Sequence, residues 1–263
     1  MNKRSEEKNL ALFIDFDNIA LGLKQSNMKK FDISLVLQRL LEKGKIVIKR
    51  AYADWSNYTE YKNELHSAGI ELIEIPKRQI SGKNSADIRL VVDAMDLCYA
   101  KEHLDTFVVL SGDSDFTPLV SKLRENDKSV IGVGVRNSSS ELLIHNCDEF
   151  IFYDDLARVA TPSPGMEAIP KEKAQVFRFL VSTIRALIRE NKEVLFSSMI
   201  KDMMKRKQPS FDEETYGYST FGDLLEDAQK FGMIGIMRDS KAGGTYVVTE
   251  LGPKAAISRS RRR

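Results

Sequence analysis

Strand-like segments alternate with amphipathic segments over the first 155 residues, and this alternation limits the possible folds more than any other feature. Two of them contain the unbroken apolar runs 10–14 and 107–110, which are typical of strands buried on both faces of a parallel sheet. The predicted strands lie at 10–15, 45–53, 70–75, 106–111, 130–135 and 149–153. Segments with helical spacing separate them, at 33–43, 57–68, 85–101, 116–126 and 139–146. The pattern predicts an α/β domain in which helices flank a parallel sheet.

A proline-rich segment, ATPSPGMEAIP at 160–170, separates this region from the last third of the chain. It holds three of the seven prolines and little periodicity, which is typical of a linker. The formal charge changes across it, from −4 over residues 1–170 to +6 over residues 171–263. We therefore predict an acidic domain for the chemistry and a basic domain for polyanion capture, with a first domain at 1–158, a linker at 159–170, a second domain at 171–251 and a basic tail at 252–263.

The second domain has the pattern of a small winged-helix module. Apolar residues recur at helical spacing, and two strand-like segments near its end are joined through glycines, as in a β-hairpin. The expected order is three helices at 172–189, 196–206 and 220–231, followed by strands at 234–238 and 245–249.

Composition and length favour a cytoplasmic protein. At 263 residues and 42% hydrophobic, the chain can bury one good core and a second, smaller one. No apolar stretch approaches the roughly 20 residues of a membrane span, and the apolar run near the start meets Asp15 at once, which argues against a signal peptide. Cys98 and Cys147 form no CxxC pair and are expected to be free thiols in a reducing compartment.

Five aspartates lie in three clusters at the ends of predicted elements. Asp15 and Asp17 follow the first strand, Asp113 and Asp115 follow the fourth strand, and Asp87 lies in the first turn of the helix between them. In open α/β sheets the carboxyl ends of the strands border the ligand crevice. The three clusters are therefore expected to meet at one edge of one sheet.

Each of these aspartates also has a structural interpretation on its own. A helix dipole stabilises a negative charge in the first turn, such as Asp87, by roughly 0.3 to 1 kcal/mol. Ser114 or Asp115 could cap the helix that follows them, and Asp17 with Asn18 could shape a tight turn. Asp113 is the better ligand candidate of its pair.

The combination of clusters favours a divalent cation. Crowded carboxylates repel one another, and a cation removes that cost. Mg²⁺ and Mn²⁺ prefer oxygen ligands, whereas the three histidines show no ligand spacing. Such a cation could activate water and neutralise charge on a phosphodiester, a chemistry that needs no ribose 2′-hydroxyl as nucleophile and so leaves RNA and DNA both open.

The runs IDFDNI, KNSADIRLVVDAMD and VLSGDSDFTPLV, in this order, resemble the NYN domain of the PIN-like nuclease superfamily. The resemblance covers about residues 8 to 155. It implies a metal-dependent endoribonuclease that acts on RNA, expected to be single-stranded. Asp15, Asp87 and Asp113 match the acidic site of the family, Asn18 its nearby amide and Asp115 a fourth acidic position. Asp93 also matches a recurrent acid, but it lies about 240° round a helix from Asp87.

Several residues near this site are candidate substrate contacts. Lys83 and Arg78 lie in the loop before Asp87 and could position phosphates there. Ser111 could orient Asp113 or end its strand. Arg136 and the serines at 138–140 follow the fifth strand, where N-capping is the alternative role for the serines.

The segment GYSTFGDLLEDAQKFGMI is similar to the LOTUS, or OST-HTH, domain, over roughly residues 170 to 250. This resemblance implies RNA binding or, in some relatives, protein binding. Basic residues of the domain could contact a phosphate backbone, although a solvated helix face has the same pattern; they are Lys201, Lys205, Arg206, Lys230 and Arg238.

Two alternatives to an active nuclease stay open. One is a catalytically inactive RNA-binding or regulatory protein. The other is a phosphatase of the haloacid dehalogenase type, because a D-F-D run follows the first strand. That family has Thr or Val at the position of Ile19, and a later G-D-x-x-x-D in place of G-D-S-D. Oligomeric state and protein partners are also left open.

Overall fold

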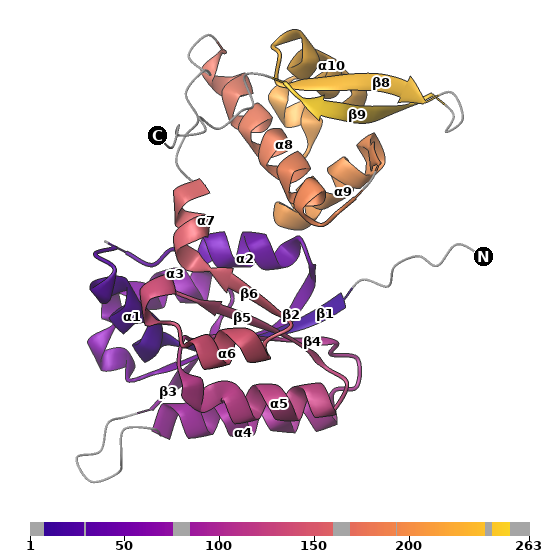
Figure 1. Ribbon diagram of the computed structural model, residues 1–263. Helices are drawn as coiled ribbons and strands as arrows, with labels where there is room; N and C mark the ends of the chain where they lie inside the picture. Colours follow the sequence, from indigo (N-terminus) through magenta and orange to yellow (C-terminus); the bar gives the residue numbers. More distant parts are fainter. Residues whose placement is uncertain are drawn as a thin grey trace, which may run out of the picture. The chain divides into compact units, whose positions relative to one another are not determined.

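The computed structural model describes residues 8–28, 30–75, 85–159, 169–192, 194–239 and 244–252 (Figure 1). The chain divides into two compact units, residues 1–160 and 161–263, and each is described by itself. No helix among the described residues is long and apolar enough to cross a membrane. The predicted linker and basic tail fall almost wholly outside the described residues.

A sheet of six parallel strands forms the centre of the first unit. All six predicted strands are present, with bounds that differ by a residue or two: β1 (Lys8–Asp15), β2 (Gly44–Ala53), β3 (Glu71–Glu74), β4 (Thr106–Leu110), β5 (Ser129–Gly134) and β6 (Glu149–Phe152). Their order across the sheet is β3-β2-β1-β4-β5-β6. The α/β prediction is confirmed.

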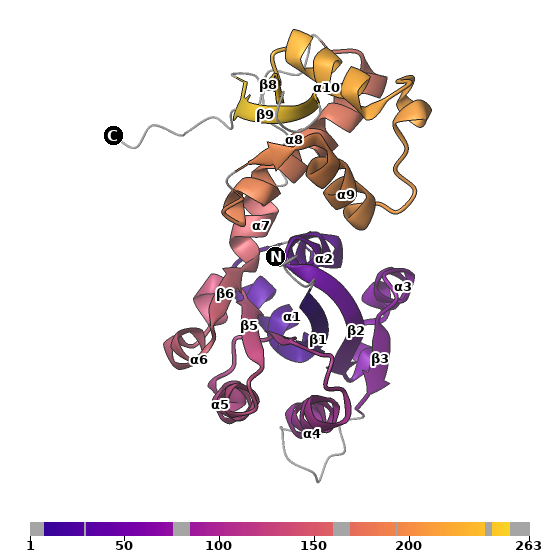
Figure 2. The same ribbon diagram turned by 90° about the vertical axis from the view of Figure 1, so that its right-hand side faces the viewer.

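Helices cover both faces of this sheet (Figure 2). Buried residues of β1 alternate between the two faces, because successive side chains of a strand point in opposite directions. Leu10, Leu12 and Ile14 pack against α1 (Phe16–Gln25), α2 (Ile33–Leu41), α3 (Thr59–Ser67) and α7 (Tyr153–Val159). Ala11 and Phe13 pack against α4 (Ser85–Ala100), α5 (Thr117–Glu125) and α6 (Glu141–Asn146).

The strand order places a topological switch point between β1 and β4. The chain builds outward from β1 through β2 to β3, then returns through α4 to β4, on the other side of β1. Connections leaving β1 and β4 therefore diverge to opposite sides, and a crevice opens between their carboxyl ends. Asp15 ends β1, and Ser111 follows β4 directly.

Two helices of the first unit were not predicted. Helix α1 begins directly after Asp15, whose side chain accepts the N–H of Asn18 and so caps it. Gly22 in its middle lowers helix propensity, but a Cβ there would lie 2.3 Å from Oγ of Ser138, so the close packing requires glycine. Helix α7 follows β6 without a break and begins at Tyr153, which was predicted as the last residue of the strand.

The second unit contains three helices and a hairpin, as predicted: α8 (Lys171–Arg189), α9 (Ser197–Lys207), α10 (Phe221–Lys230), β8 (Ile234–Asp239) and β9 (Thr245–Leu251). A short strand, β7 (Leu195–Phe196), was not predicted and pairs with β9 in a sheet ordered β7-β9-β8. Thr220 and Asp223 form a capping box that starts α10. Apolar faces of the three helices and Val248 of β9 share one core.

Candidate active site

Asp15 lies at the switch point and is the most buried of the five predicted acids. It is 4% exposed. Its Oδ1 accepts the backbone N–H of Asn18 at 3.3 Å, and its Oδ2 accepts the hydroxyl of Ser111 at 2.9 Å. These two donors come from α1 and from the loop after β4, so they fix the carboxylate between the two central strands.

The G-D-S-D loop after β4 is held by side chains on both sides. Oδ1 of Asn18 accepts the N–H of Gly112 at 2.8 Å, and Oγ of Ser111 accepts the N–H of Asp113 at 3.2 Å. Asn18 was expected as the amide of the site. In the structure its carbonyl oxygen positions the loop that carries Asp113.

The capping role expected for Ser114 or Asp115 belongs instead to Asp113. Its Oδ1 accepts the N–H of Asp115 at 3.0 Å and caps the short helix η2 (Ser114–Phe116). Helix α5 then begins at Thr117 with no side-chain cap. The reason is that a 3-10 turn precedes α5 and shifts the capping position to Asp113. Asp113 is half-buried, and Asp115 is exposed.

Asp17 is more than a turn residue, because it lies in the first turn of α1 and is half-buried. Its Oδ1 accepts the hydroxyl of Tyr58 at 2.7 Å. Tyr58, directly before α3, was not singled out in the sequence, since a tyrosine at a helix start has no distinctive pattern. Burial raises the pKa of this phenol, and the charge of Asp17 adds to that rise.

The acids from the three clusters share one electrostatic environment. Burial raises the pKa of Asp15 from 3.8 to about 7, and the charge of Asp87 adds to the rise. Burial likewise raises the pKa of Asp87 from 3.8 to about 6, with further contributions from the charges of Asp113, Asp115 and Asp17. The fold thus brings the charges of Asp17, Asp113 and Asp115 close enough to act on Asp87, and the charge of Asp87 close enough to act on Asp15.

The donor set suits a hard cation, although the side chains are not arranged as a finished metal site. Among the described residues, no three acidic, histidine or cysteine side chains are grouped so that they could hold a metal ion. Asp15, Asp17 and Asp113 instead accept hydrogen bonds from neighbouring donors. A divalent cation would favour the ionised form of both the buried Asp15 and the half-buried Asp87, whose pKa values are raised, and would neutralise their charge.

Arg136 is engaged by two side chains that follow β5 in the chain. Its guanidinium carbon lies 3.8 Å from the centre of the Phe152 ring, and one of its nitrogens is 2.8 Å from Oδ2 of Asp155. Ser140 caps α6 by accepting the N–H of Leu142. Lys83 and Arg78 lie outside the described residues.

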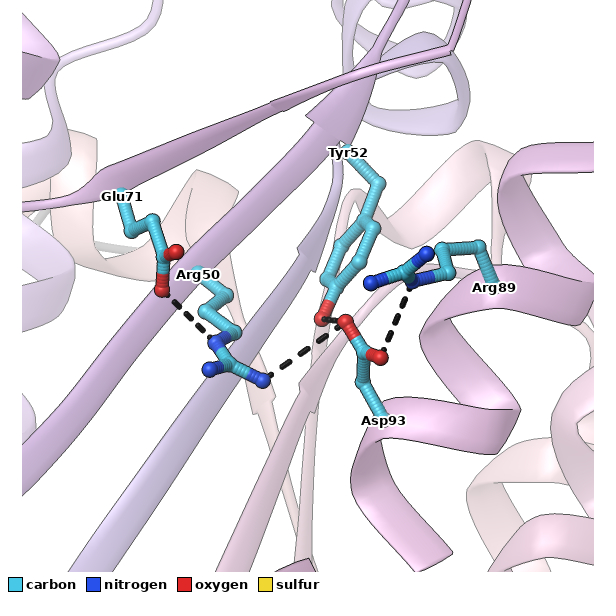
Figure 3. A network of polar contacts seen from close by, with 5 residues as sticks. All are labelled: Arg50, Tyr52, Glu71, Arg89 and Asp93. Carbon is cyan, nitrogen blue, oxygen red and sulfur yellow. Dashed lines mark hydrogen bonds and ion pairs between the residues drawn. The ribbon is translucent and has the colours of Figure 1, made fainter. Parts of the chain in front are cut away.

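Asp93 also lies apart from the acidic cluster, in a network of its own (Figure 3). It is 9% exposed and accepts the hydroxyl of Tyr52 at 2.9 Å and Nε of Arg89 at 3.0 Å. Arg50 reaches it at 3.6 Å and also pairs with Glu71 at 2.8 Å. These partners use both carboxylate oxygens of Asp93, which gives it a structural role.

In the second unit, Arg238 on β8 lies against the aromatic side chain of Tyr246 on β9. Its guanidinium carbon is 4.8 Å from the ring centre, and its Nε donates to the tyrosine hydroxyl at 2.9 Å. That hydroxyl also donates to Glu226 of α10. Arg238 stays 68% exposed, so its pairing leaves most of the guanidinium open to a further partner.

The other predicted RNA contacts differ in exposure. Lys201 pairs with Glu213 at 2.5 Å. Lys205 and Lys230 are exposed, whereas Arg206 is half-buried. The sequence pattern treats these four side chains alike, but the structure leaves Lys205 and Lys230 more accessible than Lys201 and Arg206.

The chain is similar to proteins with little recorded about their function. It is 31% identical to an uncharacterized protein, MJ0482, of Methanocaldococcus jannaschii over 151 residues, which is 57% of each chain. A crystal structure of a protein of unknown function from Vibrio parahaemolyticus, VPA0982, superposes with a TM-score of 0.52 at 23% identity, covering 59% of this chain and 98% of that one. This second likeness shows the fold alone.

Family models match both parts of the chain. The OST-HTH/LOTUS domain matches residues 176–236 and the NYN domain residues 9–154. The NYN match spans the six-stranded sheet and all five candidate acids, in the order that their sequence motifs predict. The chain therefore belongs to the NYN domain family, with an OST-HTH/LOTUS domain after its NYN domain.

Proposed function

We propose that this protein is a metal-dependent endoribonuclease, with Asp15, Asp87 and Asp113 as the residues that hold Mg²⁺ or Mn²⁺. The NYN domain is a PIN-like nuclease fold, and the OST-HTH/LOTUS domain is an RNA-binding domain. The observation that carries the proposal is the shared electrostatic environment of the acids at the switch point, where burial and the charges of neighbouring acids raise the pKa of Asp15 to about 7 and of Asp87 to about 6.

Different residues fix Asp15 and position the loop that carries Asp113. Asp15 is fixed by two donors, and Asn18 and Ser111 position the loop that carries Asp113. The exposed Asp115 lies on the open side of the same loop. A bound cation supplies a water of lowered pKa and neutralises charge on the phosphodiester. In the hydrolysis, the water oxygen forms a new bond to phosphorus, the bond to one ribose oxygen breaks, and that oxygen takes up a proton.

The acids also have a role before any cation binds. At neutral pH a carboxyl with a pKa of about 7 is partly protonated, so Asp15 must release that proton as the cation arrives. The proposed enzyme is therefore expected to need less metal at higher pH.

The second unit is proposed to bind single-stranded RNA through its exposed cations, chiefly Lys205, Lys230 and Arg238. Lys201 and Arg206 are secondary candidates, since Lys201 is engaged with Glu213 and Arg206 is half-buried. Their role is a sequence-independent attraction to phosphates.

The test is cleavage of end-labelled single-stranded and duplex RNA and DNA by the full chain, in Mg²⁺, Mn²⁺ or EDTA. Cleavage of RNA that requires metal, and is lost in Asp15→Asn and in Asp113→Asn, supports the proposal. The matched control is Asp127→Asn. Asp127 is exposed, with φ of 59°, between α5 and β5 at the opposite edge of the sheet, and asparagine tolerates that conformation.

Two results would count against the proposal. Cleavage that survives both active-site variants would exclude these carboxylates as the site. RNA that is retained in a gel shift but never cut would favour an inactive RNA-binding protein. Trapping of a phosphoenzyme on Asp15 by beryllofluoride would instead support the phosphatase alternative.

A further inference from the structure

A surface cleft of about 690 Å³ lies next to Asp87 in the first unit. Helix α4 forms one wall, and η2 and α5 form another, with Leu142 of α6 at its border. Asp87 and Asp115 both line it, so the cleft is continuous with the acidic site. Nothing in the proposed hydrolysis requires this space.

The cleft has apolar walls made by side chains that are exposed. Ile88 is 63% exposed, Val92 56% and Leu142 57%, and all three line the cleft. Single exposed aliphatic side chains are ordinary, but aliphatic residues from two helices that line one concave surface mark a binding surface. The occupant must therefore present an apolar face.

The charges of the lining residues indicate which chemical group could occupy the cleft. Among the described residues, the charged side chains that line the cleft are Asp87 and Asp115, both acidic. A phosphate group placed between the apolar walls would be repelled by these two carboxylates, whereas a neutral planar ring would not. Thr117, which also lines the cleft, has a buried hydroxyl without a hydrogen-bond partner among the described residues. Ser114 and Ser121 add two further hydroxyls for the polar edge of a ring.

We propose that the cleft receives one unpaired nucleobase of the bound RNA, next to the phosphodiester that the acids hold. The ring would lie against Ile88, Val92 and Leu142, as an unpaired base lies between aromatic or apolar side chains in a base pocket. A base within a duplex is stacked and paired, so it reaches the cleft only after unpairing. This inference rests on the proposed function for its substrate, and it adds that selection for single strands is made by this cleft.

The test uses the full chain with Asp113→Asn, so that bound RNA stays intact. Methyl resonances of Ile88, Val92 and Leu142 are recorded in Mg²⁺ with hexauridylate and with an abasic ribose-phosphate hexamer of the same length. We expect the three methyl groups to shift with hexauridylate and to stay unchanged with the abasic chain, because only the first carries bases. Equal shifts with both chains, or none with either, would overturn the proposal.

A second test measures the affinity of variants for the two chains. Leu142→Ser and Ile88→Ser are expected to weaken binding of hexauridylate about 5- to 50-fold, because each removes apolar surface that the base would cover, and to leave binding of the abasic chain unchanged. Tyr99→Ser is the matched control, since Tyr99 lies on α4, is also 63% exposed and does not line the cleft. Equal losses for both chains, or an equal loss in the control, would contradict the assignment.

The same surface could instead cover a second copy of this chain. Sedimentation of the wild type and of Leu142→Ser separates the two: a dimer that the substitution dissociates would overturn the nucleobase proposal. None of these measurements needs turnover. Shifted methyl groups in Asp113→Asn, together with a wild-type chain that does not cut RNA, would support the cleft and contradict the nuclease. Cleavage by the wild type without base-dependent shifts would do the reverse.

Discussion

Ser111 donates its hydroxyl to Oδ2 of Asp15 at 2.9 Å, while its oxygen accepts the N–H of Asp113 at 3.2 Å. One buried serine therefore links the end of β1 to the acidic loop after β4. The bond to Asp15 stabilises the carboxylate and lowers its pKa, against the larger upward effect of burial.

Ser111→Ala is expected to raise the pKa of Asp15 further, because the carboxylate loses a donor. The acidic limb of kcat/KM for RNA cleavage should move to higher pH by about one unit, the value of one hydrogen bond to a charged group. Ser34→Ala is the control: Ser34 donates its hydroxyl to Asp32 at 2.6 Å, in an exposed pair at the start of α2. A lower kcat/KM with an unchanged pH profile would show that Ser111 has a structural role only.

Asp15→Asn is expected to stabilise the protein at neutral pH while abolishing cleavage. Since the pKa of Asp15 is about 7 when folded and 3.8 when exposed, the folded state holds more protons than the unfolded state between those values. Stability from this group is full below pH 4 and falls as pH rises to 7. The variant should gain up to about 4 kcal/mol at pH 8 and almost nothing at pH 4.

Urea unfolding at pH 4 and at pH 8, monitored by circular dichroism, measures this gain. Asp127→Asn should show no such dependence on pH. An Asp15→Asn protein that is less stable at pH 8 than the wild type would show that the donors from Ser111 and Asn18 outweigh the cost of burial.

Asp93→Ala is expected to cost about 1 to 3 kcal/mol of stability, because it leaves the hydroxyl of Tyr52 and the guanidinium of Arg50 without their buried partner. Arg89 is 56% exposed and can be solvated, which limits the loss. Affinity for Mn²⁺, measured by calorimetry, should stay within twofold. Asp96→Ala, an exposed acid of the same helix, should change neither quantity. A loss of Mn²⁺ affinity that matches that of Asp113→Asn would make Asp93 part of the metal site.

Lys205→Ala and Lys230→Ala are expected to weaken RNA binding by the full chain and to reduce the salt dependence of that binding. Each lost phosphate contact with single-stranded RNA should reduce the slope of log K against log salt by about 0.7. Lys122→Ala is the control, since Lys122 lies on α5 of the first unit and pairs with Glu125 at 2.7 Å. An unchanged slope in both variants would place the RNA elsewhere, or indicate a protein partner for the second unit.

The sequence predicts the centre of the sheet well because β1 and β4 contain unbroken apolar runs that are buried on both faces. It predicts α1 poorly, since Gly22 reads as a helix breaker until its packing against Ser138 is known. The position of the acids at the ends of strands and helices predicts where they lie. It does not predict which acid caps a helix, because the 3-10 turn that makes Asp113 the N-cap depends on local backbone geometry.

Contacts between distant parts of the chain are also beyond the sequence. The bond from Tyr58 to Asp17 joins α1 to the start of α3, 41 residues apart. The cleft beside Asp87 needs Leu142 from a third helix. Neither feature is formed by a single segment of the chain, so neither appears as a sequence motif.

The bond between Ser111 and Asp15 spans 96 residues. A growing chain that has reached only α4 already contains Asp15, Asp17 and Asp87, yet it lacks the strand and the donor that hold Asp15 in place. The site is thus assembled late, after β4 inserts beside β1, and long-range contacts of this kind form slowly. Fragments that stop before Ser111 are expected to carry three of the five acids and no nuclease activity, whereas the first unit contains all five acids and the donor.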